Sequence, residues 1–69
     1  MSDTITVNGK TRVWRDETMR DLVVALGLVP EKGGIAIAVN AAVVPRAEWP
    51  TRRVAPDDRV EIVQIVRGG

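Results

Sequence analysis

The sequence predicts an α+β domain in which a single helix packs on one face of a mixed β-sheet. Its 69 residues suffice for one domain. Several short segments show the alternation or the aliphatic density of β-strands, whereas one segment has its apolar residues at helical spacing. Because this helix is too short to be stable alone, it needs a sheet to lie on. The predicted order of elements is β-β-α-β-β-β.

The first two strands are predicted to form a hairpin. Residues 4–7 alternate polar and apolar side chains, and Asn8-Gly9 follows them directly. This dipeptide is the strongest short hairpin signal, because both residues tolerate positive φ. The return strand is expected over residues 11–14. Ile5, Val7 and Val13 are expected to share the face that points to the core.

A helix of two to three turns is predicted to begin after Thr18, with Asp21 as its capping partner. Gly27 stands where a left-handed residue commonly ends a helix. The residues spaced to form one apolar face are Met19, Leu22, Val23 and Leu26. The following Gly33-Gly34 lacks the Lys-Ser/Thr of a phosphate loop, and we interpret it as a flexible loop.

The second half of the chain contains the other strands. Residues 35–39 and 42–44 are predicted strands separated by a turn at Asn40-Ala41. Residues 46–55 are expected to be irregular or to hold one short helical turn, anchored by Trp49.

Residues 56–58 are predicted to form a tight turn before the last strand, at residues 60–66. If the first and last strands lie parallel and adjacent in the sheet centre, the fold is the ubiquitin-like β-grasp. The domain is then expected to span residues 1–66, followed by a flexible tail at residues 67–69.

The composition excludes several classes of site. The chain has no cysteine and no histidine, so it has no disulfide framework, no thiol or imidazole nucleophile and no metal site built on these ligands. Its net charge of +1 argues against a dedicated nucleic-acid surface. No apolar run reaches the roughly 20 residues that span a bilayer, and the N-terminus does not resemble a signal peptide. We therefore expect a cytoplasmic protein.

The sequence shows no catalytic site. Asp57-Asp58 is the only adjacent acidic pair, and its position indicates turn chemistry. Arg52-Arg53 is interpreted as a solvated pair of charges. Gly68-Gly69 is different, because it follows the last predicted strand directly. Glycine has no Cβ and accepts almost any backbone conformation, so such a tail can thread a narrow channel in another enzyme and present its carboxylate there.

Several segments together resemble one known family. They are Ala36-Ile37-Ala38-Val39-Asn40, Val44-Pro45-Arg46 with Trp49, Asp58-Arg59-Val60-Glu61-Ile62-Val63 and the closing Gly68-Gly69. Over nearly its whole length the chain resembles the sulfur carrier proteins of thiamin biosynthesis, the ThiS family. One departure is that Pro56-Asp57-Asp58 replaces the Asp-Gly-Asp common in the family. Aspartate tolerates the left-handed conformation better than most residues, so the turn is expected to survive.

The resemblance implies that the chain is a protein co-substrate and not an enzyme. A ThiF-type adenylating enzyme would use ATP to convert the Gly69 carboxylate to an acyl adenylate. A sulfurtransferase or cysteine desulfurase would then supply sulfur to form a C-terminal thiocarboxylate. Thiazole synthase (ThiG) would receive that sulfur. We expect no bound cofactor, no metal, and no nucleic-acid or membrane partner. The resemblance makes Arg67 and Gly68 part of the reactive tail.

The last strand also predicts a partner-docking face. Val60 and Ile62 should face the helix, which by alternation turns Glu61, Val63 and Ile65 to the opposite side. Beside them the neighbouring strand should present Ala36 and Ala38. We expect this flat, mildly apolar patch to dock the adenylating enzyme and the synthase.

Three alternative functions remain open. The chain could be a related carrier for molybdopterin, cysteine or siderophore synthesis. It could also be a ubiquitin-like modifier that conjugates to lysines, with Lys10 and Lys32 as its own lysines. Thirdly, it could be an interaction domain whose terminal glycines are incidental.

Overall fold

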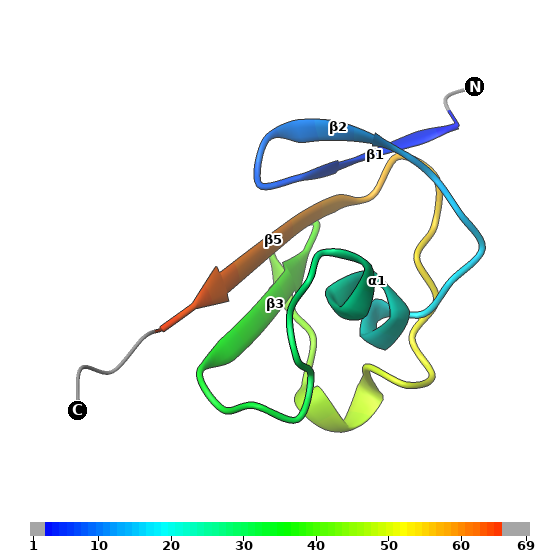
Figure 1. The fold of residues 1–69 in the computed structure, drawn as a ribbon. Helices are drawn as coiled ribbons and strands as arrows, with labels where there is room; N and C mark the ends of the chain where they lie inside the picture. Colours follow the sequence, from blue (N-terminus) through cyan, green and yellow to red (C-terminus); the bar gives the residue numbers. More distant parts are fainter. Residues whose placement is uncertain (1–2, 66–69) are drawn as a thin grey trace.

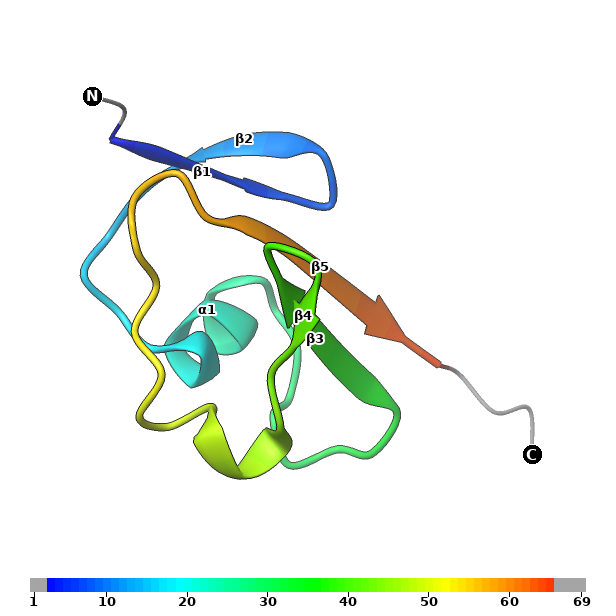
Figure 2. The same cartoon turned by 180° about the vertical axis from the view of Figure 1, so that it is seen from behind.

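The computed structural model describes residues 3–65, which form five strands and one α-helix (Figure 1). The sheet order is β2-β1-β5-β3-β4, so the last strand lies in the centre. β5 pairs in parallel with β1 and antiparallel with β3 (Figure 2). This is the predicted β-grasp topology. The strands are β1 (Thr4–Val7), β2 (Lys10–Val13), β3 (Ile35–Val39), β4 (Ala42–Val43) and β5 (Arg59–Gln64).

Both turns that the sequence predicts between paired strands form, and both have a left-handed backbone. Asn8 and Gly9 join β1 to β2 with φ of 51° and 82°. Asn40 and Ala41 join β3 to β4 with φ of 51° and 71°. Positive φ at both central residues matches the right-handed twist of the flanking strands. Asp57, ahead of β5, also has positive φ (69°), so aspartate serves in the turn where the family commonly has glycine.

The prediction that Val13 shares the core face is wrong. The two-residue turn pairs Val7 with Lys10, so Ile5 lies opposite Arg12 and Val13 lies opposite Thr4. Directly paired residues share a face of the sheet. Lys10 and Arg12 therefore lie on the helix side, whereas Val13 is on the other side and is 64% exposed.

Helix α1 (Met19–Ala25) begins and ends as predicted. The Thr18 side chain accepts a bond from the Asp21 amide, and the Asp21 side chain accepts one from the Thr18 amide. This capping box satisfies two amides that have no partner within the helix. Gly27 follows the helix with φ of 83°, a conformation that glycine adopts without steric cost.

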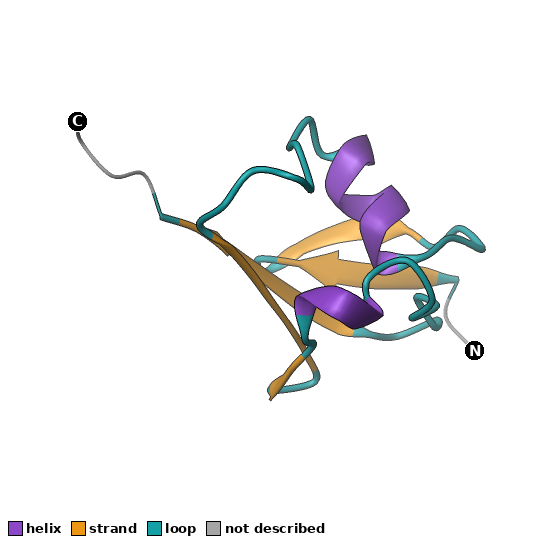
Figure 3. Cartoon of the chain, turned by 90° about the horizontal axis from the view of Figure 1, so that it is seen from below, coloured by secondary structure: helices purple, strands orange, loops and turns teal. Residues whose placement is uncertain are grey.

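The core lies between α1 and one face of the sheet (Figure 3). Its aliphatic residues come from the inward positions of the three central strands and from the apolar stripe of the helix. Trp49 is the aromatic residue among its fully buried members. The members that lie in strands or in α1 are Ile5, Val7, Met19, Leu22, Val23, Ile35, Ile37, Val39, Val60 and Ile62.

A short 3₁₀ helix (Arg46–Glu48) follows β4, within the segment predicted to be irregular or to hold one short helical turn. Its Arg46 side chain lies over the Trp49 ring, 4.3 Å from the ring centroid, and donates to the carbonyls of Pro30 and Lys32. The indole of Trp49 donates to the Val44 carbonyl at 3.1 Å. The Val-Pro-Arg-x-x-Trp segment thus joins the loop after α1 to the end of the sheet, which is a structural role.

Candidate functional site

The candidate site is the carboxyl end of β5 and the sheet face around it. β5 ends at Gln64, and the Ile65 amide donates to the Gly34 carbonyl at 2.7 Å. The predicted strand extended to Val66, which lies outside the described residues. Arg67, Gly68 and Gly69 lie outside them as well, so the predicted reactive tail is placed only by the strand that leads into it.

Two asparagine side chains hold β5 from both sides. Asn8 accepts from the Ile62 amide at 2.8 Å and donates to the Ile62 carbonyl at 3.1 Å. It thereby extends the short β1–β5 ladder with a side chain in place of a strand residue. Asn40 accepts from the Arg59 amide at 2.9 Å on the other side. The strand that leads into the tail is therefore held by these side-chain hydrogen bonds in addition to its backbone ladder.

Asp58 supports the same strand from its amino end. This residue is buried, and its carboxylate accepts from the Ala55 amide at 2.8 Å and from the Asn40 side chain at 3.1 Å. The acidic pair therefore serves the turn, as the sequence predicts. The described residues contain no group of three or more side chains that could hold a metal ion. No helix within residues 3–65 is long and apolar enough to cross a membrane.

The predicted docking residues gather on the face of the sheet that α1 does not cover. Val63 and Ile65 are 57% and 59% exposed, and Glu61 is exposed beside them. The register places Ala36 opposite Val63 and Ala38 opposite Glu61. We call Ala36, Ala38, Val43, Val63 and Ile65 the outer patch. The structure confirms that these side chains share one open face, while their docking role stays a prediction.

Sequence reasoning missed Val43 as a member of this patch. It pairs with Ala38 across β3 and β4 and is 77% exposed. The signal was present in the Asn40-Ala41 turn, because a two-residue turn sets the register of the strands that it joins. The outer patch therefore extends over three strands and not only over two.

The interpretation of Gly33-Gly34 as a flexible loop needs correction. Gly34 has φ of 86°, and a Cβ at this position would lie 2.6 Å from the Ile65 carbonyl oxygen. A Cβ at Gly33 would meet nothing within 4 Å. Gly34 is therefore required by its conformation and by the close approach of the backbone at the end of β5.

The arginine pair does not form one site. Arg53 lies 3.6 Å from Asp16 in an exposed ion pair and forms an isolated bridge with Thr18. Arg52 is exposed, and its carbonyl accepts from the Met19 amide. Near the same helix end, the Thr18 backbone amide lowers the pKa of the Asp21 carboxyl by donating to it. These contacts fix the start of α1.

Comparisons with known proteins agree with the fold. A crystal structure of the thiamine biosynthesis protein ThiS from Geobacter metallireducens is 26% identical, with a TM-score of 0.76 over 96% of this chain and 99% of that chain. A solution structure of a thiamine biosynthesis protein from the same organism is 25% identical, with a TM-score of 0.77 over 96% and 87%. No curated protein matches the chain. The ThiS family matches residues 5–69, nearly the whole length, and this chain belongs to that family.

Proposed function

We propose that this protein carries sulfur as a thiocarboxylate on Gly69 and donates it to thiazole formation in thiamin biosynthesis. Membership of the ThiS family is the observation that carries the proposal. The composition supports it, because a chain without cysteine cannot hold sulfur as a side-chain persulfide. The C-terminal carboxylate is then the group on which sulfur is carried, and the protein acts as a co-substrate and not as a catalyst.

The proposed chemistry has two stages, both performed by partner enzymes. A Gly69 carboxylate oxygen attacks the α-phosphorus of ATP in a ThiF-type enzyme, and pyrophosphate leaves. A persulfide from a sulfurtransferase or cysteine desulfurase then displaces AMP, and a thiol reduces the resulting acyl disulfide to the thiocarboxylate. ThiG accepts the sulfur. In this proposal ATP is the substrate of the partner and not a cofactor of this chain.

The proposed docking face is the outer patch together with Glu61. It extends from the middle of β5, where Ala38 pairs with Glu61, to the carboxyl end of that strand, so a partner that covers it lies beside the point where the tail begins. Scattered apolar side chains are normal on a monomer, but here five aliphatic side chains share one face of three paired strands and the residue that follows β5. Burying this area would supply about 25 cal/mol per Å² before the costs of association.

Intact mass spectrometry tests the chemistry. The full chain is incubated with ATP, its adenylating enzyme and a sulfur source, and we expect the mass gain of one oxygen-to-sulfur exchange at the C-terminus. Deleting Gly69 shortens the tail by about 3.5 Å and should abolish this gain, because the new carboxylate falls short of the α-phosphate. The deletion should leave the amide spectrum of residues 3–65 unchanged. Normal sulfur loading of the deletion variant would contradict the mechanism, and isopeptide adducts to lysines would favour a protein modifier.

A further inference from the structure

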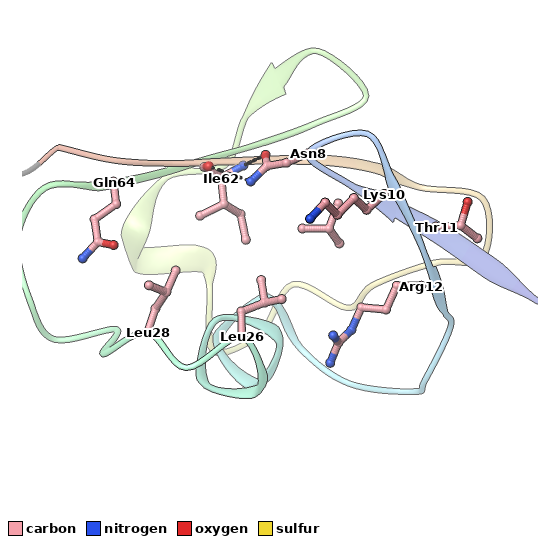
Figure 4. A pocket seen from close by; sticks show the side chains of 9 residues that line it. Asn8, Lys10, Thr11, Arg12, Leu26, Leu28, Ile62 and Gln64 are labelled. Carbon is pink, nitrogen blue, oxygen red and sulfur yellow. Dashed lines mark hydrogen bonds between the residues drawn. The ribbon is translucent and has the colours of Figure 1, made fainter.

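A groove of about 500 Å³ opens between the β1–β2 hairpin and the end of α1. Leu26 and Leu28 point into it from the helix side, toward Ile62 and Gln64 on β5 (Figure 4). Both leucines are only half-buried, although they pack against the core. The floor of the groove is therefore aliphatic and open to solvent.

The wall of the groove is positively charged. Lys10 and Arg12 line it from β2, and no aspartate or glutamate lines it. Among residues 3–65, the ion pairs are Arg20–Glu31 and Arg53–Asp16, so neither groove cation has an acidic partner within that range. Arg12 is half-buried where it lines the groove. A ligand that brings a carboxylate would supply the missing counter-charge.

The groove also runs along a free edge of the sheet. β2 is one of the two edge strands of the sheet, and it contains no proline or bulge that would block pairing. Val7 and Lys10 flank the turn and exchange ladder bonds, so alternation turns the amides and carbonyls of Thr11 and Val13 outward. An extended chain laid beside β2 could use these groups, as strand addition to a sheet edge requires.

We propose that the groove between β2 and α1 binds an extended segment of a partner protein in which aliphatic residues adjoin acidic ones. The segment pairs with the outward backbone groups of Thr11 and Val13. Its aliphatic side chains pack on Leu26 and Leu28, and its carboxylates pair with Lys10 and Arg12. The groove lies on the helix side of the sheet, opposite the outer patch, so both surfaces can be occupied at once.

An NMR titration of the full chain tests this inference without any enzyme or ATP, so its outcome is independent of the sulfur-carrier proposal. The probe is the peptide acetyl-Asp-Val-Ile-Val-Glu-amide. We expect saturable amide shifts at residues 10–13 and 26–28, and slower hydrogen exchange at the Thr11 and Val13 amides. A peptide with alternate backbone nitrogens methylated should bind at least tenfold more weakly, because it cannot complete the ladder.

Charge reversal supplies the matched control. Lys10→Glu/Arg12→Glu should weaken peptide binding about tenfold or more, whereas Arg52→Glu/Arg59→Glu, with the same change in net charge, should bind within about twofold of the parent. The spectrum of each variant checks its fold. The proposal is overturned if the peptide shifts map to the outer patch, if no saturable shift appears, or if the methylated peptide binds as well as the parent peptide.

Discussion

The two faces of β5 carry the same kind of side chain with opposite surroundings. Val60 and Ile62 face α1 and are buried, whereas Val63 and Ile65 face the other way and are more than half exposed. One face is covered by the helix of the same chain, and no element within residues 3–65 covers the other. Aliphatic composition therefore does not distinguish core from interface in this strand. The two faces differ in whether a helix of the same chain covers them.

The largest expected effect separates the two faces by stability. Ile62→Ala should lower the free energy of unfolding by about 2–5 kcal/mol, because it removes a buried aliphatic side chain from the core. Ile65→Ala, the same substitution on the open face, should change it by less than about 0.5 kcal/mol. Urea unfolding measures both. Equal losses in the two variants would show that the open face also contributes to folding.

The second prediction separates the faces by binding. Val63→Asp and Ile65→Asp should each weaken the complex with the adenylating enzyme about tenfold or more, ~1.4 kcal/mol, because each puts a charge into the proposed interface. Val29→Asp is the control, since Val29 is similarly exposed at 54% but lies outside the outer patch. Calorimetric titration gives the affinities. Unchanged affinity of both patch variants would contradict the proposal that the outer patch docks the adenylating enzyme.

The third prediction concerns the loop beside the end of β5. Gly34→Ala should destabilise the domain by about 1–2 kcal/mol from the left-handed backbone alone, with a further cost because the new Cβ meets the Ile65 carbonyl. Gly33→Ala should be nearly neutral, because a Cβ there meets nothing. Thermal unfolding distinguishes the two. If Gly34→Ala left the unfolding temperature unchanged, the backbone at Ile65 would have to shift without loss of stability.

The smallest effect lies at the start of α1, the helix that covers one face of β5, at the exposed residue Asp21. Because the Asp21 carboxyl has a lowered pKa when folded, its ionised form stabilises the folded state above the ordinary pKa and this contribution is lost as pH falls through the folded value. Asp21→Asn should therefore be less stable than the parent at neutral pH. Denaturation at several pH values should show the difference shrinking below about pH 4. A difference that stays constant with pH would contradict this linkage.

Most of the fold was predictable because its signals are local. Asn8-Gly9 specifies a two-residue turn, and Thr18 with Asp21 specifies the helix start. The face of Val13 was predicted wrongly because apolar type was given more weight than register. The turn itself pairs Ile5 with Arg12, which puts two cations beside the helix and opens the groove.

The contacts of Arg46 and the close approach at Gly34 were not predictable from the sequence. Each depends on a segment far along the chain that folding brings near: Arg46 reaches the loop after α1, and Gly34 meets the end of β5. The members of the outer patch followed from alternation along β5 and β3, except for Val43. The reactive tail stays a prediction that rests on its glycines, on their place after the last strand and on the family resemblance, because residues 67–69 lie outside the described residues.

The central position of β5 also has a mechanical consequence. A force applied at its carboxyl end acts along the strand, across hydrogen bonds that run sideways to β1 on one flank and to β3 on the other. Such bonds share the load and must fail together, whereas a strand drawn sideways from a sheet edge separates one bond at a time. The side-chain bonds of Asn8 and Asn40 lie across the same direction and add to the resistance. A partner that pulls on the end of this chain therefore draws the whole domain onto the partner's surface before any strand separates from the sheet.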